Sequence, residues 1–307
     1  MFSGIVFGLS AAFLMALSYV FSKRFILTYG SPFQLTVYSQ LIQGIFGIIV
    51  LSFLAGKYEY PLYSADNGID WVNLGFVVIA GATSMTGNFC FFRLLKELEA
   101  SRSSSLLGLK MIVLGLISSI FIGEDLNLQQ WLAIVLASVA AVGMNFTGGR
   151  IPLKAAVWLM LTLLGYSSSD LSVAELVFRI EGEGCCPAFV ANGICCLFSG
   201  IAMLPLLFLK QMPKKICMFT DAAPYALGWF TGVMCLLCSF DLVGVIFGTI
   251  LQSARGVISV IFGVLLVRMG VPGYEPIVRR ADWIRRFVMS VLMVLALALY
   301  AFSRQTA

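Results

Sequence analysis

The sequence contains no histidine, and charged residues are scarce. Of its 307 residues only 11% are charged, whereas 60% are hydrophobic, and the mean hydropathy is +0.97. Soluble domains are about one quarter charged and about half apolar, so a water-exposed globule could not cover this much apolar surface. The lack of histidine excludes a histidine proton relay. The composition therefore indicates an integral membrane protein, for which lipid is the solvent.

Eight cysteines are present, but they form no complete metal motif. Cys235 and Cys238 make a single C-x-x-C pair inside an apolar run, without a second pair. A structural zinc site needs four ligands, so the cysteines are interpreted as small packing residues. We expect no metal, cofactor or disulfide to be required, and nothing in the sequence indicates nucleic-acid binding.

Apolar runs separated by polar, glycine or proline residues predict ten transmembrane helices. A spanning helix needs roughly 20 apolar residues, and the runs have about this length. The predicted ranges are 3–22, 32–54, 72–92, 102–122, 129–147, 154–174, 187–209, 224–241, 243–267 and 284–302. The first run has no basic segment before it and no small-residue cleavage site after it, so it is expected to be a permanent helix.

The two halves of the sequence carry traces of an internal repeat. A Thr-Gly-x-x-Cys motif that begins at Thr86 recurs 145 residues later, and the same shift places Lys110 over Arg255. A shift of 147 residues places Tyr19 over Tyr166. Because each half has an odd number of helices, the second half must lie in the opposite orientation, as in transporters with inverted repeats.

Three segments of the first half belong to a recognisable pattern: 17–23 (LSYVFSK), 87–101, and the Gly-Glu-x-Leu turn at 123–126. With them the sequence resembles the EamA-like branch of the drug/metabolite transporter superfamily. In the second half, 248–252 (GTILQ) resembles the matching ninth helix, although a Met-Gly pair at 269–270 replaces the Gly-Glu turn. The resemblance implies a central cavity lined partly by the fourth and ninth helices, and export or exchange of small metabolites.

The predicted fold is therefore all-α, with ten transmembrane helices in two inverted five-helix repeats of the EamA type. The repeats are expected to cover residues 1–148 and 149–307. Substrate sites of such proteins tend to lie near the bilayer midplane, between the repeats. The expected setting is the bacterial inner membrane, where a monomer or homodimer would meet lipid and a small-molecule substrate.

Two cations lie well inside predicted helices. Lys110 is about eight residues into the fourth helix, and Arg255 is about twelve residues into the ninth. A cation at such depth costs at least about 2.5–3.5 kcal/mol on insertion scales, so each must face a cavity or a partner. One interpretation is a pair that binds an anionic substrate, with bidentate contacts from the arginine. The other is that internal acids neutralise both. The resemblance favours the first, because the phosphate-ester and nucleotide-sugar branches of the superfamily carry cations in these helices.

The other candidate residues are polar groups within apolar helices. Asp170 lies inside the sixth predicted helix. It is interpreted as the counter-ion of Arg255, as a protonatable coupling group, or as the end of that helix in headgroup water. Gln40, Gln43 and Gln252 are candidate substrate ligands, with interhelical hydrogen bonding as the alternative.

Two aromatic residues complete the candidate site. Tyr19 and Tyr166 are expected to wall the cavity, with ordinary packing as the alternative. Together these residues predict a secondary transporter that moves a small organic metabolite of anionic character by alternating access. An exporter of neutral amino acids, sugars or cationic drugs is the alternative, although the first helix lacks the carboxylate that the small multidrug branch uses. A membrane-embedded enzyme is a remote alternative, because no paired carboxylates or Ser/His arrangement occurs at membrane depth.

Positive charge is distributed unevenly between the predicted loops. Loops that follow odd-numbered helices contain most of the lysines and arginines, including the pairs at 214–215 and 285–286. The other side contains Lys57, Arg179 and Arg304. The positive-inside rule places the basic loops in the cytoplasm and both termini outside, whereas the resemblance implies termini inside.

The charge distribution predicts the outcome of a reporter fusion. Alkaline phosphatase fused after Ala307 is expected to be active, and a fluorescent protein fused there is expected to stay dark, since the C-terminus lies outside the cytoplasm. Strong fluorescence from the C-terminal fusion would contradict the charge-based orientation.

Overall fold

The structure is a computed structural model that describes residues 2–56, 61–64, 68–98, 103, 106–122, 126–144, 151–182, 184–209, 212, 216–255, 258, 261–262 and 280–305. Within these ranges the chain is almost wholly helical. A small antiparallel hairpin, β1 (Tyr63–Ser64) and β2 (Gly68–Ile69), precedes the third long helix. The Gly-Glu turn at 123–125 and the segment 263–279 lie outside the described residues.

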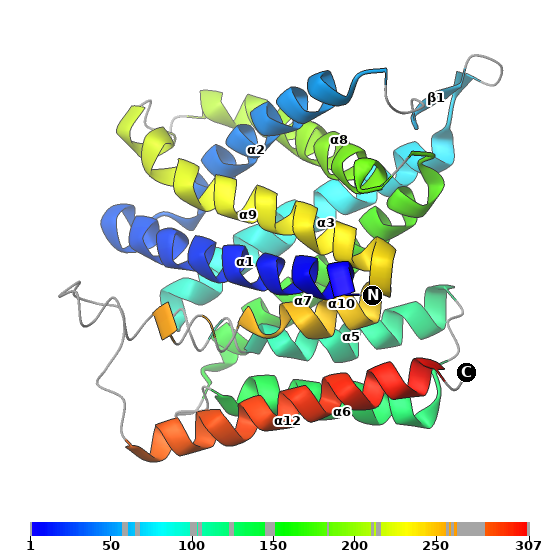
Figure 1. The fold of residues 1–307 in the computed structure, drawn as a ribbon. Helices are drawn as coiled ribbons and strands as arrows, with labels where there is room; N and C mark the ends of the chain where they lie inside the picture. Colours follow the sequence, from blue (N-terminus) through cyan, green and yellow to red (C-terminus); the bar gives the residue numbers. More distant parts are fainter. Residues whose placement is uncertain are drawn as a thin grey trace.

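The helices follow the predicted apolar runs. In chain order they are α1 (Phe2–Tyr29), α2 (Pro32–Leu54), α3 (Trp71–Glu97), η1 (Leu107–Leu109), α5 (Lys110–Ile117), the π-helical turn η2 (Ser118–Ile122), α6 (Leu128–Met144), α7 (Leu153–Arg179), α8 (Cys186–Met203), η3 (Leu204–Phe208), α9 (Ile216–Val243), α10 (Val245–Gln252) and α12 (Arg280–Gln305) (Figure 1).

Five of these segments are long and apolar enough to cross a membrane, judged by length and composition. They are α1, α2, α3, α8 with η3, and α9. Large apolar side chains such as Phe53, Trp71 and Phe208 point outward and are well exposed. An exposed apolar surface of this extent is stable against lipid tails and not against water. The protein is therefore a multi-pass membrane protein.

Local sequence signals explain where the first helices begin and end. Gly30 has a φ of 67°, a left-handed conformation that glycine adopts without strain, and it ends α1. Ser31 then caps α2 by accepting a hydrogen bond from the Gln34 amide at 3.3 Å, with Pro32 in the first turn. The Asp70 carboxylate caps α3 in the same way.

The long helices pack in pairs that join the two halves of the chain. α1 packs along α9, α3 along α7, α2 along α8, and α6 along α12. The short helices α5 and α10 contact each other between these pairs, and α10 also contacts α1 and α12 (Figure 1). The centre of the bundle is therefore formed by segments from both halves.

Several predicted helix ends were wrong, most clearly those of the first and eighth helices. The first helix was expected to stop at residue 22, but α1 continues to Tyr29. It can do so because the Lys23 ammonium donates hydrogen bonds to the carbonyls of Leu95 (2.5 Å) and Leu98 (3.1 Å), at the end of α3. The eighth helix was expected to start at residue 224, but α9 starts at Ile216 and includes Pro224.

The fourth and ninth helices are interrupted, whereas the sequence predicted continuous runs over 102–122 and 243–267. α5 starts only at Lys110, after the 3-10 turn η1. α10 ends at Gln252, and the amide of Ala254 bonds to the carbonyl three residues back, at 3.1 Å. Lys110 is therefore the first residue of a helix, and Arg255 follows the end of one. Broken helices at membrane depth are tolerated where they line a protein-enclosed site.

The α2–α8 pair meets backbone to backbone. A Cβ atom on Gly44 would lie 2.9 Å from the Cα of Gly200, and one on Gly47 would lie 2.6 Å from the carbonyl oxygen of Gly193. Real Cβ atoms do not approach backbone this closely. Small residues are what allow membrane helices to pack at such short range.

This contact predicts the effect of adding a single methyl group. Gly44→Ala is expected to destabilise the protein by roughly 1–3 kcal/mol, the usual cost of overpacking, as measured by thermal unfolding in detergent. Gly75→Ala in α3 is the matched control, because no atom lies within 4 Å of the Cβ it would add. An equal Tm for the two variants would contradict the tight α2–α8 contact.

Candidate functional site

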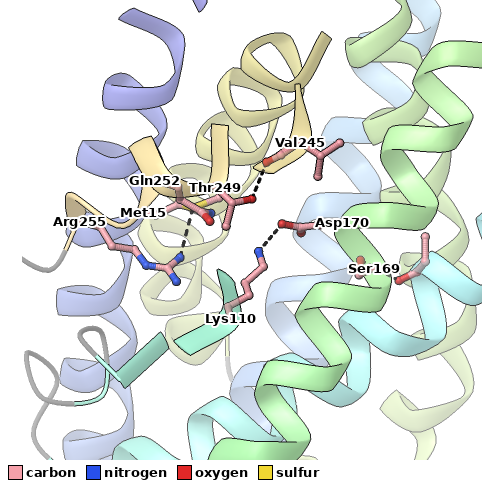
Figure 2. A network of polar contacts seen from close by, with 9 residues as sticks. Met15, Lys110, Ser169, Asp170, Val245, Thr249, Gln252 and Arg255 are labelled. Atoms are coloured by element: carbon pink, nitrogen blue, oxygen red, sulfur yellow. Dashed lines mark hydrogen bonds and ion pairs between the residues drawn. The ribbon is translucent and has the colours of Figure 1, made fainter. Parts of the chain in front are cut away.

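The first feature of the centre is a buried ion pair between two helices. The Lys110 ammonium on α5 contacts the Asp170 carboxylate on α7 (Figure 2). The Lys110 side chain is 3% exposed and the Asp170 side chain 19%. Burial of a cation is costly unless a counter-charge is close, so Asp170 supplies the charge that allows Lys110 to lie here.

Arg255 is equally buried but lacks such a partner. Its exposed fraction is 3%. The guanidinium lies 5.8 Å from the centre of the Tyr19 ring, and one of its terminal nitrogens lies 4.0 Å from the Met15 sulfur. The described residues offer it no carboxylate, and its Nε atom has no hydrogen-bond partner among them. A ring face and a thioether compensate only a small part of a buried positive charge.

The polar groups beside Arg255 are also incompletely satisfied. Gln252 donates to the Met15 sulfur at 2.8 Å, but its carbonyl oxygen is buried and accepts no bond from the described residues. The hydroxyl of Tyr19 is likewise buried without a partner there. Buried polar atoms in proteins are nearly always paired, so three unmatched groups side by side indicate a place where a polar ligand or water belongs.

A small cavity lies on the other side of Asp170. Gln40, Gln43 and Asn192 line it together with Asp170 and Tyr166, and the side-chain amide nitrogens of both glutamines have no described partner. Its volume is about 50 Å³. This is room for a few water molecules and far less than the roughly 300–1,000 Å³ of a typical small-molecule site. The centre is therefore closed around its own side chains.

Aromatic side chains lie in contact with one another from the cavity to Arg255. The Asn88 side-chain oxygen accepts hydrogen bonds from Tyr166 at 2.9 Å and from Tyr225 at 3.1 Å. Trp229 lies against both of these rings and against Tyr19, with centroid distances of 5.5–6.1 Å. Since Tyr166 and Trp229 also line the cavity, the two tyrosines are fixed in place between the two polar regions.

The structure divides the predicted site residues into two groups. Lys110, Arg255, Gln252 and Tyr19 lie together at the broken helices, where the two cations are close enough to repel each other (Figure 2). Gln40, Gln43 and Tyr166 lie at the cavity. Asp170 contacts both regions. Whether any of these residues bind substrate stays a prediction.

Two interpretations of Asp170 are wrong. It is not the counter-ion of Arg255, because its carboxylate pairs with Lys110. Nor does the sixth helix end there in headgroup water, because α7 continues to Arg179 and the side chain lies inside the bundle. The apolar residues after Asp170 continue the helix, which hydropathy alone did not show.

Several residues of the centre were missed. Met15 and Trp229 read as ordinary apolar residues, and nothing in the sequence marks them. Asn88 and Asn192 could have been identified from the sequence, because each is an amide side chain within a largely apolar helix. The candidate glutamines have the same property. Asn88 falls inside the Thr-Gly-x-x-Cys motif, where it was treated as a variable position.

Comparison with known proteins identifies the first half of the chain. Residues 2–146 match the profile of the EamA-like transporter family. The N-terminal half of the chain is therefore similar to this family. A protein of Sinorhizobium sp, described as an uncharacterized transporter in the cobO 3' region, is 29% identical to this chain over 134 residues, which are 44% of the chain and 89% of that protein. Both matches support a membrane transporter.

A solved structure is similar to the chain over almost its whole length. Its title states only that it is the crystal structure of a protein. It matches with a TM-score of 0.62 and 17% sequence identity, over 99% of this chain and 98% of that one. At this identity the likeness shows a shared fold and nothing about the substrate.

The Asn88 hydrogen bonds predict a non-additive loss of stability. Tyr166→Phe and Tyr225→Phe should each cost about 0.5–1.5 kcal/mol, since the Asn88 oxygen keeps one donor. The double variant should cost more than the sum, because that oxygen is then buried without a donor. Tyr29→Phe is the control, since Tyr29 donates to Asp221 at an exposed position. Thermal unfolding in detergent measures all four, and strict additivity would contradict the shared acceptor.

Proposed function

We propose that this EamA-like protein is a secondary transporter of a small organic anion in the bacterial inner membrane. Residues 1–148 and 149–307 form two inverted repeats of five spans each, and the substrate passes between them by alternating access. Because the central cavity holds only a few waters, the structure corresponds to a closed state. Substrate enters when the helices around Asp170 and Tyr166 move apart.

The pairing of helices supports the inverted repeat. In such a repeat α1 corresponds to α7, and α3 corresponds to α9. The contact of α1 with α9 is then the image of the contact of α7 with α3, and both are observed. The repeat also relates α2 to α8 and α6 to α12. The observed contacts within these two pairs therefore each join a helix to its own counterpart in the other half.

The interruptions of the two central helices support the same relation. The 145-residue shift carries η1 (Leu107–Leu109) onto 252–254, where the ninth helix tightens into a turn. The same shift carries Lys110 onto Arg255. Both halves therefore have a break followed at once by a cation. Discontinuous helices of this kind form the substrate sites of several transporter folds.

The unpaired guanidinium of Arg255 is the observation that carries the anion assignment. A buried arginine without a counter-charge is strongly unfavourable, and an anionic substrate removes that cost. Arginine also binds carboxylate and phosphate through two parallel hydrogen bonds. A cationic drug would be repelled by Arg255, and a neutral solute would leave its charge uncompensated.

The assignment predicts the behaviour of Arg255 variants. Arg255→Gln should weaken the anion-induced rise in Tm by at least about tenfold in ligand concentration, since one lost charge-assisted contact is worth about 1.5–3 kcal/mol. Arg255→Lys should recover part of it, because a charge returns without the planar fork. The measurement is thermal unfolding of purified protein with carboxylates, phosphate esters, neutral amino acids, sugars and cationic drugs.

Lys154→Gln provides the matched control, because Lys154 is a cation that is 67% exposed and pairs with Glu97. It should behave like the natural protein. If neutral or cationic compounds stabilise the natural protein and anions do not, the anion assignment is wrong. The same conclusion follows if Arg255→Gln keeps the full anion response.

A further inference from the structure

We infer that Asp170 is a built-in counter-ion that restricts the transported anion to a single negative charge, so that the substrates are organic monoanions such as monocarboxylates. The inference rests on the proposed anion transport and adds the charge of the substrate. It follows from the arrangement of three charged side chains at the centre, of which two, Lys110 and Asp170, form an ion pair (Figure 2).

The first step is the net charge of the side chains at the centre. Lys110 and Arg255 are both almost completely buried. The Asp170 carboxylate is engaged by Lys110. The second salt bridge of the described part of the chain joins Lys154 to Glu97 at the surface, so no described acid compensates Arg255. Among the described residues, two cations and one carboxylate give the centre a net charge of one positive unit.

The second step is the charge of the anion that this net positive charge can bind. A monoanion bound at Arg255 makes the centre neutral. A dianion leaves one negative charge without a partner in a region shielded from water, and charges interact much more strongly there than in solution. The added repulsion comes from Asp170 itself, which lies next to Lys110 and prevents it from serving as the second ligand.

The third step is the position of Asp170 between the two polar regions. The carboxylate contacts Lys110 and also lines the cavity beside Gln40 and Gln43. The negative charge of Asp170 therefore acts on a substrate in the cavity as well as on the region of the two cations. The unpartnered amide nitrogens of both glutamines offer hydrogen-bond donors to the polar part of such a substrate without adding charge.

The test compares two probes of similar shape and different charge, benzoate and phthalate, by their effect on the Tm of the purified full-length protein at pH 7.5. The natural protein should be stabilised at about tenfold lower concentrations by benzoate than by phthalate. Asp170→Asn raises the charge of the centre by one and frees Lys110, so the preference should reverse. Asp221→Asn, the same substitution at the exposed end of α9, should leave the preference as it is.

The double variant Lys110→Gln/Asp170→Asn restores the original net charge and should regain the preference for benzoate. Lys110→Gln alone leaves Asp170 to cancel Arg255 and should lose the response to both probes. Comparison of Lys110→Gln with the double variant tests the role of Asp170 even if Asp170→Asn alone fails to fold. The double variant avoids that problem because it buries no unpaired lysine.

The outcomes separate this inference from the proposed function. If benzoate and phthalate both stabilise the protein through Arg255, but Asp170→Asn keeps the preference for benzoate and Lys110→Gln responds to both probes as the double variant does, the role of Asp170 is wrong and anion transport stands. A natural protein that prefers phthalate has the same meaning. If neither probe and no other anion stabilises the natural protein, both proposals fail together.

Discussion

The cost of holding charge away from water governs the centre of this protein. Lys110 and Arg255 are buried to the same degree, yet one has a carboxylate and the other has a ring face and a sulfur atom. In a low-dielectric interior that difference is large. The Lys110 ammonium is neutralised by Asp170, whereas Arg255 has no carboxylate partner among the described residues.

The broken helices place these charges where they are needed. A continuous helix leaves no free backbone polar groups, while a break exposes amides and carbonyls that must find other partners. Both breaks lie in the fourth and ninth segments, which contact each other through α5 and α10. The polar backbone, the two cations and the unmatched groups of Gln252 and Tyr19 therefore share one region of the bundle.

Much of the fold followed from hydropathy, because lipid-facing helices must be apolar along a predictable length. The second helix was predicted at 32–54, the range that α2 occupies. The interruptions near Lys110 and Arg255 were missed, since a shift from four-residue to three-residue hydrogen bonding changes no residue's hydropathy. The extension of α1 past Lys23 was missed because it depends on carbonyls of α3, which are distant in the sequence.

The sequence predicted which residue types lie at the site, but it did not predict which of them pair with each other. The depth of Lys110 and Arg255 marked them as costly, and the repeat suggested that they meet. The sequence could not say which cation Asp170 would join, because that depends on how α7 is rotated against α5 and α10. The choice of Asn88 as the acceptor shared by two tyrosines likewise depends on how α3 packs against α7 and α9.

The hydrogen bonds of Lys23 connect α1 to the end of α3. Its ammonium holds the carbonyls of Leu95 and Leu98 at the end of α3, while α1 and α3 each pack on a different helix of the second half. Two charge-assisted hydrogen bonds therefore couple α1 to α3, in addition to the apolar contacts between them. Because α1 packs on α9 and α3 packs on α7, a displacement of either helix is expected to affect contacts with two different helices of the second half.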